Sequence, residues 1–88
     1  MKHKFVKSDR IKINILNTLK ETGKPFSYYQ LTKCIKTTWN SLVPNCYFLS
    51  ALDLIKITEG SSPGMKFKNI WITKKGVKAL DKLTKSED

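Results

Sequence analysis

The chain has 88 residues, enough for one domain with a single modest hydrophobic core. Lys and Arg number 17 against 7 Asp and Glu, and the formal net charge is +10. Such an excess favours a polyanionic partner, with nucleic acid before an anionic membrane, although the charge can also serve solubility. No apolar run approaches the roughly 20 residues of a membrane span, and no signal peptide is recognisable. We therefore expect a cytoplasmic protein that does not bind membranes.

The residues that carry catalysis or bind metals are sparse. His3 is the only histidine, and the seven acids are scattered without a pair that could flank a substrate. Cys34 and Cys46 lack the spacing of a zinc site, and we expect both to be buried thiols. No glycine-rich loop opens a helix, as phosphate-binding loops do. The sequence thus predicts a protein that is not an enzyme and has no metal and no cofactor.

Residues 1–7 are basic, and we expect them to be flexible. A first helix is predicted over 9–22, capped by Ser8 or Asp9 and ended by Gly23 and Pro25. Its apolar residues recur on one face, which is predicted to face the core: Ile11, Ile15, Leu16 and Leu19.

A second helix is predicted over 28–36, because Ser27 and Gln30 form a capping-box pattern and Tyr28, Leu31 and Ile35 follow at helical spacing. A turn over 37–40 leads to a third helix over 42–52 with Ser41 as its cap. This register places Pro44 at the third helical position, where a missing amide costs nothing. The stripe predicted to face the core is Leu42, Cys46, Leu49 and Leu52, and the opposite side comprises Val43, Pro44, Asn45, Tyr47, Phe48, Ser50 and Ala51.

Two strands are predicted after the third helix, one from Leu54 to Ile57 and one over 70–72. Residues 59–69 between them are expected to form a long basic loop. A short third strand is expected near Pro25 and Phe26. Thr73 is predicted to cap a last helix whose inward residues are Val77, Leu80 and Leu83. Gly76 lowers the stability of this helix slightly, and 84–88 are expected to form a flexible tail. The predicted class is α+β, with one domain spanning 1–88.

Three segments carry a family resemblance: SYYQLTKCIK, SLVPNCYFLSALDLI and IWITKKGVKAL. Together they resemble the winged helix-turn-helix transcriptional regulators of archaea, bacteria and their viruses, over about 9–83. Asp53, Leu54 and Ile55 stand where that family has a Gly-Leu-Ile-like step, and Thr73 to Gly76 match its Thr-x-x-Gly helix start. The resemblance implies a regulator that binds double-stranded DNA as a homodimer, with the third helix in the major groove and the hairpin, or wing, on the backbone or minor groove.

Site residues follow from the same resemblance by position. Asn45, Tyr47 and Phe48 would face bases or sugars, and Lys66 and Lys68 would lie on the wing. The phosphates would be contacted from the second helix and the turn, and the predicted DNA-binding set is completed by Lys33, Lys36, Thr37, Thr38, Asn40 and Ser41. The third helix departs from the family pattern because it lacks the Arg, Lys or Gln that reads a base edge, and Asn45 is the amide on its predicted outer face.

An alternative function is protein recognition. The outer side of the third helix is apolar, and such a surface is unusual unless it binds a partner. The residues of this alternative interface are Trp39, Val43, Pro44, Tyr47 and Phe48. Structured RNA is a further alternative, because lysines do not distinguish the backbones of RNA and DNA.

Overall fold

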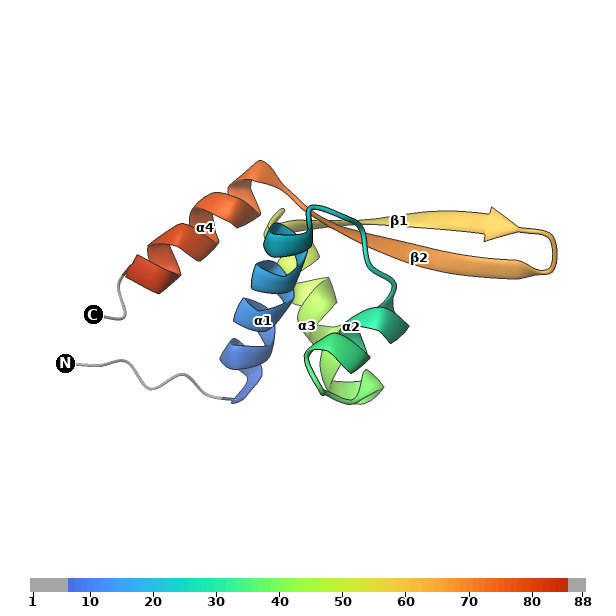
Figure 1. Cartoon of the computed structure of the whole chain (residues 1–88), viewed down its shortest axis with the longest axis horizontal. Helices are drawn as coiled ribbons and strands as arrows, with labels where there is room; N and C mark the ends of the chain where they lie inside the picture. Colours follow the sequence, from blue (N-terminus) through green and yellow to red (C-terminus); the bar gives the residue numbers. More distant parts are fainter. Residues whose placement is uncertain (1–6, 86–88) are drawn as a thin grey trace.

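A computed structural model of the chain describes residues 7–85, which form four helices and one antiparallel hairpin (Figure 1). The elements are α1 Lys7–Thr22, α2 Tyr28–Cys34, α3 Trp39–Ala51, β1 Ile55–Ser62, β2 Met65–Ile72 and α4 Lys74–Lys85. The predicted α+β class and the order of elements are confirmed. Lys7 is already in α1, and residues 84 and 85 are still in α4. The remaining end residues lie outside the described part.

Helix α1 begins before its predicted caps, so Ser8 and Asp9 are helical residues. Its predicted face is confirmed: Ile15, Leu16 and Leu19 are fully buried and Ile11 nearly so. Gly23 ends the helix with a φ of 63°, the left-handed conformation that glycine adopts without steric cost. Helix α1 thereby supplies one wall of the core.

Helix α2 has the predicted capping box. The Gln30 amide donates to Ser27 Oγ at 3.1 Å, and the Ser27 amide donates to Gln30 Oε1 at 3.0 Å. The helix ends at Cys34, earlier than predicted, because Lys36 takes a left-handed φ of 53° and the Thr37 amide donates to the Thr32 carbonyl at 3.0 Å. This pattern is a Schellman end with Lys36 in the position usually held by glycine.

Helix α3 starts three residues before the predicted register. Thr38 is the cap, and its hydroxyl accepts from the Ser41 amide at 3.3 Å, so Ser41 is a helical residue and the prediction that it caps the helix is wrong. The early start is favoured by Trp39, whose ring packs edge-on against Tyr28 with centroids 5.4 Å apart. Pro44 is consequently the sixth helical residue, where its missing amide leaves the Asn40 carbonyl without the usual helical donor.

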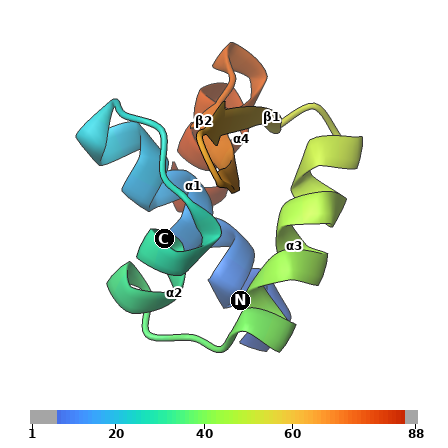
Figure 2. The same ribbon diagram turned by 90° about the vertical axis from the view of Figure 1, so that its right-hand side faces the viewer.

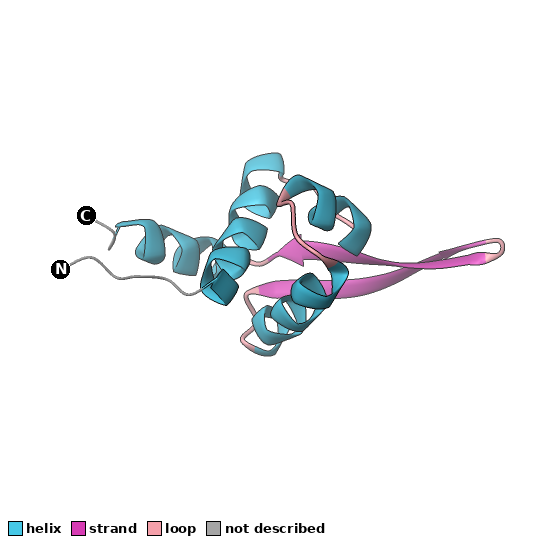
Figure 3. Cartoon of the chain, turned by 90° about the horizontal axis from the view of Figure 1, so that it is seen from below, coloured by secondary structure: helices cyan, strands magenta, loops and turns pink. Residues whose placement is uncertain are grey.

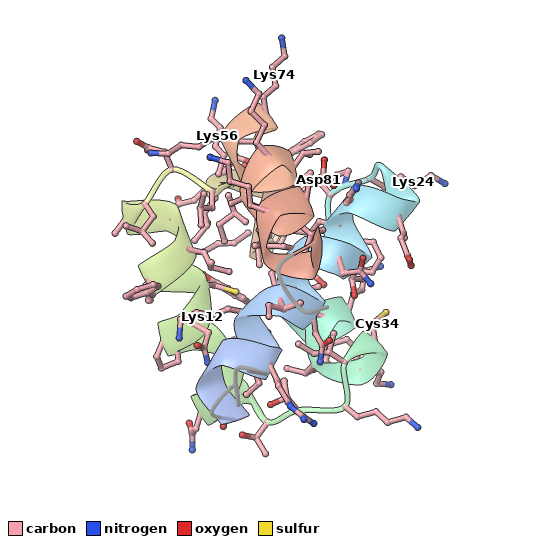
Figure 4. The ribbon with its side chains drawn as sticks, turned by 90° about the vertical axis from the view of Figure 1, so that its left-hand side faces the viewer. Lys12, Lys24, Cys34, Lys56, Lys74 and Asp81 are labelled. Atoms are coloured by element: carbon pink, nitrogen blue, oxygen red, sulfur yellow. The ribbon has the colours of Figure 1, made fainter. Side chains whose placement is uncertain are left out.

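The core lies where α1, α2, α3 and the base of the hairpin meet. Its buried residues beyond α1 are Tyr28, Leu31, Leu42, Cys46, Leu49, Ile55, Ile70 and Leu80. Two core predictions are wrong. Leu52 is 45% exposed because the helix has ended and Asp53 turns the chain with a φ of 60°. Cys34 is exposed, since it lies at the outer end of the short helix α2 (Figure 4).

The hairpin is longer and more regular than predicted. Strands β1 and β2 pair from Ile55 with Ile72 to Ser62 with Met65, and only Pro63 and Gly64 form the turn. Gly64 has a φ of 80°, as expected for the third position of a type II turn that follows proline. The hairpin therefore projects well beyond the helices (Figure 3). The expected third strand is a single bridge between Phe26 and Ile70.

Helix α4 begins as predicted. The Thr73 hydroxyl accepts from the Gly76 amide at 3.0 Å and also lies 2.6 Å from the Asp53 carbonyl, to which it donates. This contact joins the start of α4 to the end of α3. Lys20 and Asp81 pair at 2.8 Å between α1 and α4, and both side chains are about half exposed. Helix α4 thus lies against α1 at the end of the molecule away from the hairpin tip (Figure 1).

Candidate nucleic-acid interface

Helices α2 and α3 and the hairpin share one end of the molecule. Viewed from the hairpin tip, α2 and α3 lie on either side below the strands (Figure 2). A groove of about 690 Å³ opens among these three elements. We call it the aromatic groove, and its lining consists of Tyr28, Tyr29, Trp39, Val43, Tyr47 and Phe67, with Ser27, Glu59 and Lys68.

Helix α3 contributes one stripe to this groove. Trp39, Val43 and Tyr47 follow at intervals of four residues, so their side chains share one face of the helix. The Trp39 and Tyr47 side chains are 52% and 53% exposed. Phe48 is equally exposed at 52%, but it lies on another flank, where the Lys12 ammonium from α1 sits 4.7 Å from its ring centroid. The outer surface of α3 is therefore divided between two aromatic sites.

The hairpin contributes Phe67, whose position depends on the glycine opposite it. Phe67 pairs with Gly60 across the strands, and a Cβ added at Gly60 would overlap the Phe67 ring. The ring therefore lies directly across the Gly60 backbone. Glu59 and Lys68 form the neighbouring cross-strand pair, and both also line the groove.

Two lysines contact rings of the groove. The Lys33 ammonium lies 4.6 Å from the centroid of Tyr29, and the Lys68 ammonium lies 5.8 Å from the centroid of Tyr47. Both distances are within the range of cation–π attraction. Tyr29 was not predicted as a site residue, although the spacing of Tyr28, Leu31 and Ile35 already placed it off the core face. Phe67 was also missed, because its role depends on the pairing with Gly60.

The residues predicted to face phosphates fall partly on this end of the molecule. Lys33, Lys36 and Asn40 are exposed, whereas Thr37 and Ser41 are half-buried and the Thr38 hydroxyl accepts the capping bond. Lys68 is half-buried beside Tyr47. For Lys66 the structure gives only its backbone pairing with Ser61. The exposed Lys33 and Lys36 thus lie on α2 and the turn, and the half-buried Lys68 lies on the wing.

The predicted outward position of Asn45 is wrong. Asn45 is only 8% exposed, and its side-chain amide donates to the Ser41 carbonyl at 2.6 Å. The earlier start of α3 does not cause this. Leu42, Asn45, Cys46 and Leu49 have the three-, four- and seven-residue spacing of a buried helical face, so Asn45 belongs to the core stripe. Asn40, near the start of α3, is the exposed amide of the helix.

Burial also changes two groups beneath the groove. Burial, together with the Cys46 thiol and the Tyr47 phenol, raises the pKa of Tyr28 to about 12. Burial raises the pKa of the Cys46 thiol to about 12 as well. Both groups are therefore neutral at physiological pH.

Residues 7–85 contain neither a metal-ion cluster nor a membrane-spanning helix. No group of three His, Cys, Asp or Glu side chains is placed there to hold a metal ion. None of the helices in this part of the chain has the length and apolar character needed to cross a bilayer.

Comparison with known proteins shows which solved structures share this arrangement of helices and hairpin. No family model matches the sequence, and no curated protein matches it. Solved structures do match. A PadR-like transcription factor from Bacteroides fragilis has a TM-score of 0.80 at 23% identity, over 91% of this chain and 82% of that one. A PadR family transcription regulator from Clostridium difficile R20291 has a TM-score of 0.76 at 19% identity, over 86% and 84%. A PadR-like transcriptional regulator from Bacillus cereus has a TM-score of 0.73 at 24% identity, over 86% and 79%.

The fold is that of the winged helix-turn-helix regulators. In this fold α2 and α3 form the helix-turn-helix, and the β1–β2 hairpin is the wing. The predicted fold is thereby confirmed. The identities lie below 25%, so the likeness establishes architecture.

Proposed function

We propose that the protein binds double-stranded DNA as a transcriptional regulator. The observation that carries the proposal is the convergence of α2, α3 and the wing on one end of a chain with a net charge of +10. Lys33, Lys36 and Lys68 lie around that end. In this arrangement α3 enters the major groove, while α2, the turn and the wing contact phosphates or the minor groove.

The chemistry of α3 suggests modest sequence selectivity. The helix contains no Lys or Arg, and Asn45 is held inside the core. Asn40 replaces it as the proposed base reader, because it is exposed in the first turn of α3 and an asparagine amide pairs with an adenine edge. Tyr47 and Phe48 would then contact sugars or thymine methyl groups.

We further propose a homodimer that acts in the cytoplasm, where its DNA would be. Helix α4 lies at the opposite end from the wing tip (Figure 1), so pairing through α4 would leave both wings free for DNA. Sedimentation at several protein concentrations tests this point, and a monomer at all concentrations would contradict it.

Titration of the full chain against a random duplex and against genomic fragments, each at two salt concentrations, tests DNA binding. With about six phosphate contacts the slope of log affinity against log salt should be near −5. Asn40→Ala should reduce the preference for favoured fragments while leaving affinity for the random duplex nearly unchanged. Affinity that barely depends on salt would refute the proposal.

The second candidate is a protein-interaction module. It is favoured by the exposure of Trp39, Pro44, Tyr47 and Phe48, with half-buried Val43, on a helix without charges, since aromatic anchors are common interface hot spots. Replacing Tyr47 and Phe48 together by Ser should abolish such a complex and leave salt-sensitive duplex binding mostly in place. Loss of duplex binding alone in this variant would argue against the second candidate.

A further inference from the structure

The aromatic groove has features that matched duplex DNA does not use. Its rings come from α2, α3 and the wing, and Tyr29, Trp39, Tyr47 and Phe67 are 60%, 52%, 53% and 39% exposed. The bases of a duplex are stacked on one another, so they present edges to a protein and keep their flat faces covered. Four exposed rings around one groove therefore call for an occupant with free flat faces.

The charges identify that occupant further. Lys33 and Lys68 hold their ammonium groups over Tyr29 and Tyr47, at the two sides of the groove. Glu59 also lines the groove, and it is paired across the strands with Lys68. A carboxylate repels phosphate but accepts hydrogen bonds from the N–H groups of a nucleobase. The pattern fits a planar base within the groove and phosphates on the lysines at its rim.

The groove is also preformed. Trp39 is braced edge-on by Tyr28, and Phe67 lies across Gly60, where no side chain separates ring from backbone. Its volume of about 690 Å³ is within the range of small-ligand sites. Rings that are already held in place lose little freedom when a base stacks on them, so the platform favours binding.

We infer that the aromatic groove binds an unpaired nucleobase, and that the protein binds single-stranded or locally unpaired DNA more tightly than matched duplex of the same sequence. The inference rests on the proposed function in that both require nucleic acid as the partner. In this inference the affinity comes from stacking of the base on Trp39 and Tyr47. Lys33 and Lys68 bind the flanking phosphates.

Trp39 provides a direct readout. The chain has two tryptophans, and Trp71 lies on the wing outside the groove, where its Nε1 donates to Thr58 Oγ1 at 3.0 Å. In a Trp71→Phe variant the emission comes from Trp39. Titration with oligo-dT of about 12 nucleotides, within the site sizes of single-strand binders, should quench this emission. Absence of quenching at saturation would overturn the inference.

Affinities are measured in parallel for the oligo-dT strand, the matched dT·dA duplex and the same duplex with a central mismatched bubble. Tyr47→Leu and, separately, Tyr29→Leu should weaken binding to the strand and the bubble by about 5- to 100-fold, as loss of one stacking contact implies. The affinity for matched duplex should fall by a smaller factor, since stacking of this kind does not contribute to it. Leu52→Ala is the control, because Leu52 is 45% exposed at the end of α3 but lies outside the groove, and it should leave both affinities unchanged.

The outcomes separate the two proposals. Salt-steep binding of matched duplex with no preference for the strand or bubble would refute the inference and leave the proposed function standing. Binding of none of the three would refute both. A change in Trp39 emission with protein concentration in the absence of DNA would show that a second copy covers the groove, and would also overturn the inference.

Discussion

The Lys68 ammonium on the wing lies 5.8 Å from the centroid of the Tyr47 ring on α3. Lys68 and Tyr47 are far apart in the sequence, and one cation–π contact joins the two elements that carry them. The wing and the third helix therefore present their surfaces together, and a phosphate that reaches Lys68 lies beside α3 as well.

This arrangement predicts the salt dependence of DNA binding. Lys68→Ala and Lys33→Ala should each weaken binding to every sequence and reduce the magnitude of the salt slope by about 0.9, the value of one phosphate contact. The measurement is fluorescence anisotropy with a random duplex at four or more salt concentrations. Lys78→Ala is the control, since this exposed lysine lies on α4 at the other end of the molecule. An equal reduction in the control would mean that general charge, and not this surface, drives binding.

Pro44 should destabilise the helix that contains it. As the sixth residue of α3 it deprives the Asn40 carbonyl of an amide donor. Pro44→Ala should therefore raise the free energy of unfolding by about 2 kcal/mol, after allowing for the greater freedom of the unfolded chain. Thermal and denaturant unfolding measure it.

Pro63 supplies the control for Pro44. It lies in the hairpin turn, where no helical amide is restored by substitution, so Pro63→Ala should lower stability slightly. If Pro44→Ala were also neutral or destabilising, α3 would have to begin near Ser41, as the capping pattern alone suggested.

Asn45 should contribute to stability and not to base recognition. Its amide hydrogen bond to the Ser41 carbonyl is made by a side chain that is 8% exposed. Asn45→Ala should lower the free energy of unfolding by about 1 kcal/mol and leave the preference among DNA fragments unchanged. The matched variant Asn40→Ala should leave the free energy of unfolding nearly unchanged and reduce the preference among DNA fragments, because Asn40 is exposed. Lost selectivity in a stable Asn45→Ala protein would contradict the buried placement.

Much of the fold follows from local patterns. The capping box at Ser27, the glycine end at Gly23 and the Thr73 cap were all predicted, because each depends on a few neighbouring residues. The start of α3 was not, since serine is a better cap than threonine by type and Ser41 was favoured over Thr38. The choice between them is made by the packing of Trp39 on Tyr28, which the spacing of residues along one helix does not reveal.

The candidate site was less predictable than the fold. Lys33 and Lys68 were anticipated as cations on the right elements, but their contacts with Tyr29 and Tyr47 depend on how α2, α3 and the wing meet. Asn45 is a different kind of error. Its spacing from Leu42 and Leu49 fits a buried helical face, but the predicted stripe of Leu42, Cys46, Leu49 and Leu52 assigned Asn45 to the opposite side.

Gly76 gives a prediction that opposes helix propensity. Alanine is favoured over glycine in a helix by about 1 kcal/mol, and the sequence marked Gly76 as a mild cost. In the structure Gly76 is buried, and a Cβ there would overlap the Leu54 carbonyl oxygen and press on Ile72. Gly76→Ala should therefore lower the free energy of unfolding by about 2 kcal/mol, in the range of overpacking mutations. Lys75→Ala, at the exposed neighbouring position, should have little effect, and stabilisation by Gly76→Ala would refute the close contact.

The two cysteines should differ sharply in reactivity. Cys34 is exposed, whereas Cys46 is fully buried and burial raises the pKa of its thiol to about 12. Because the thiolate is the reactive species, a thiol reagent should label one cysteine of the native chain rapidly and the second only as the chain unfolds. Mass spectrometry of the labelled peptides identifies which one reacts.

The same burial sets the response of Cys46 to pH. Well below about pH 8.5 the thiol is protonated in both the folded and unfolded chain. Between there and about pH 12 the unfolded chain loses its proton first, so the contribution of Cys46 to stability is present at lower pH and is lost as pH rises. Labelling of Cys46 in the native chain should therefore follow global unfolding even at pH 9. Cys34→Ala isolates this reaction, and rapid labelling of that variant under native conditions would show that the core around Cys46 opens locally.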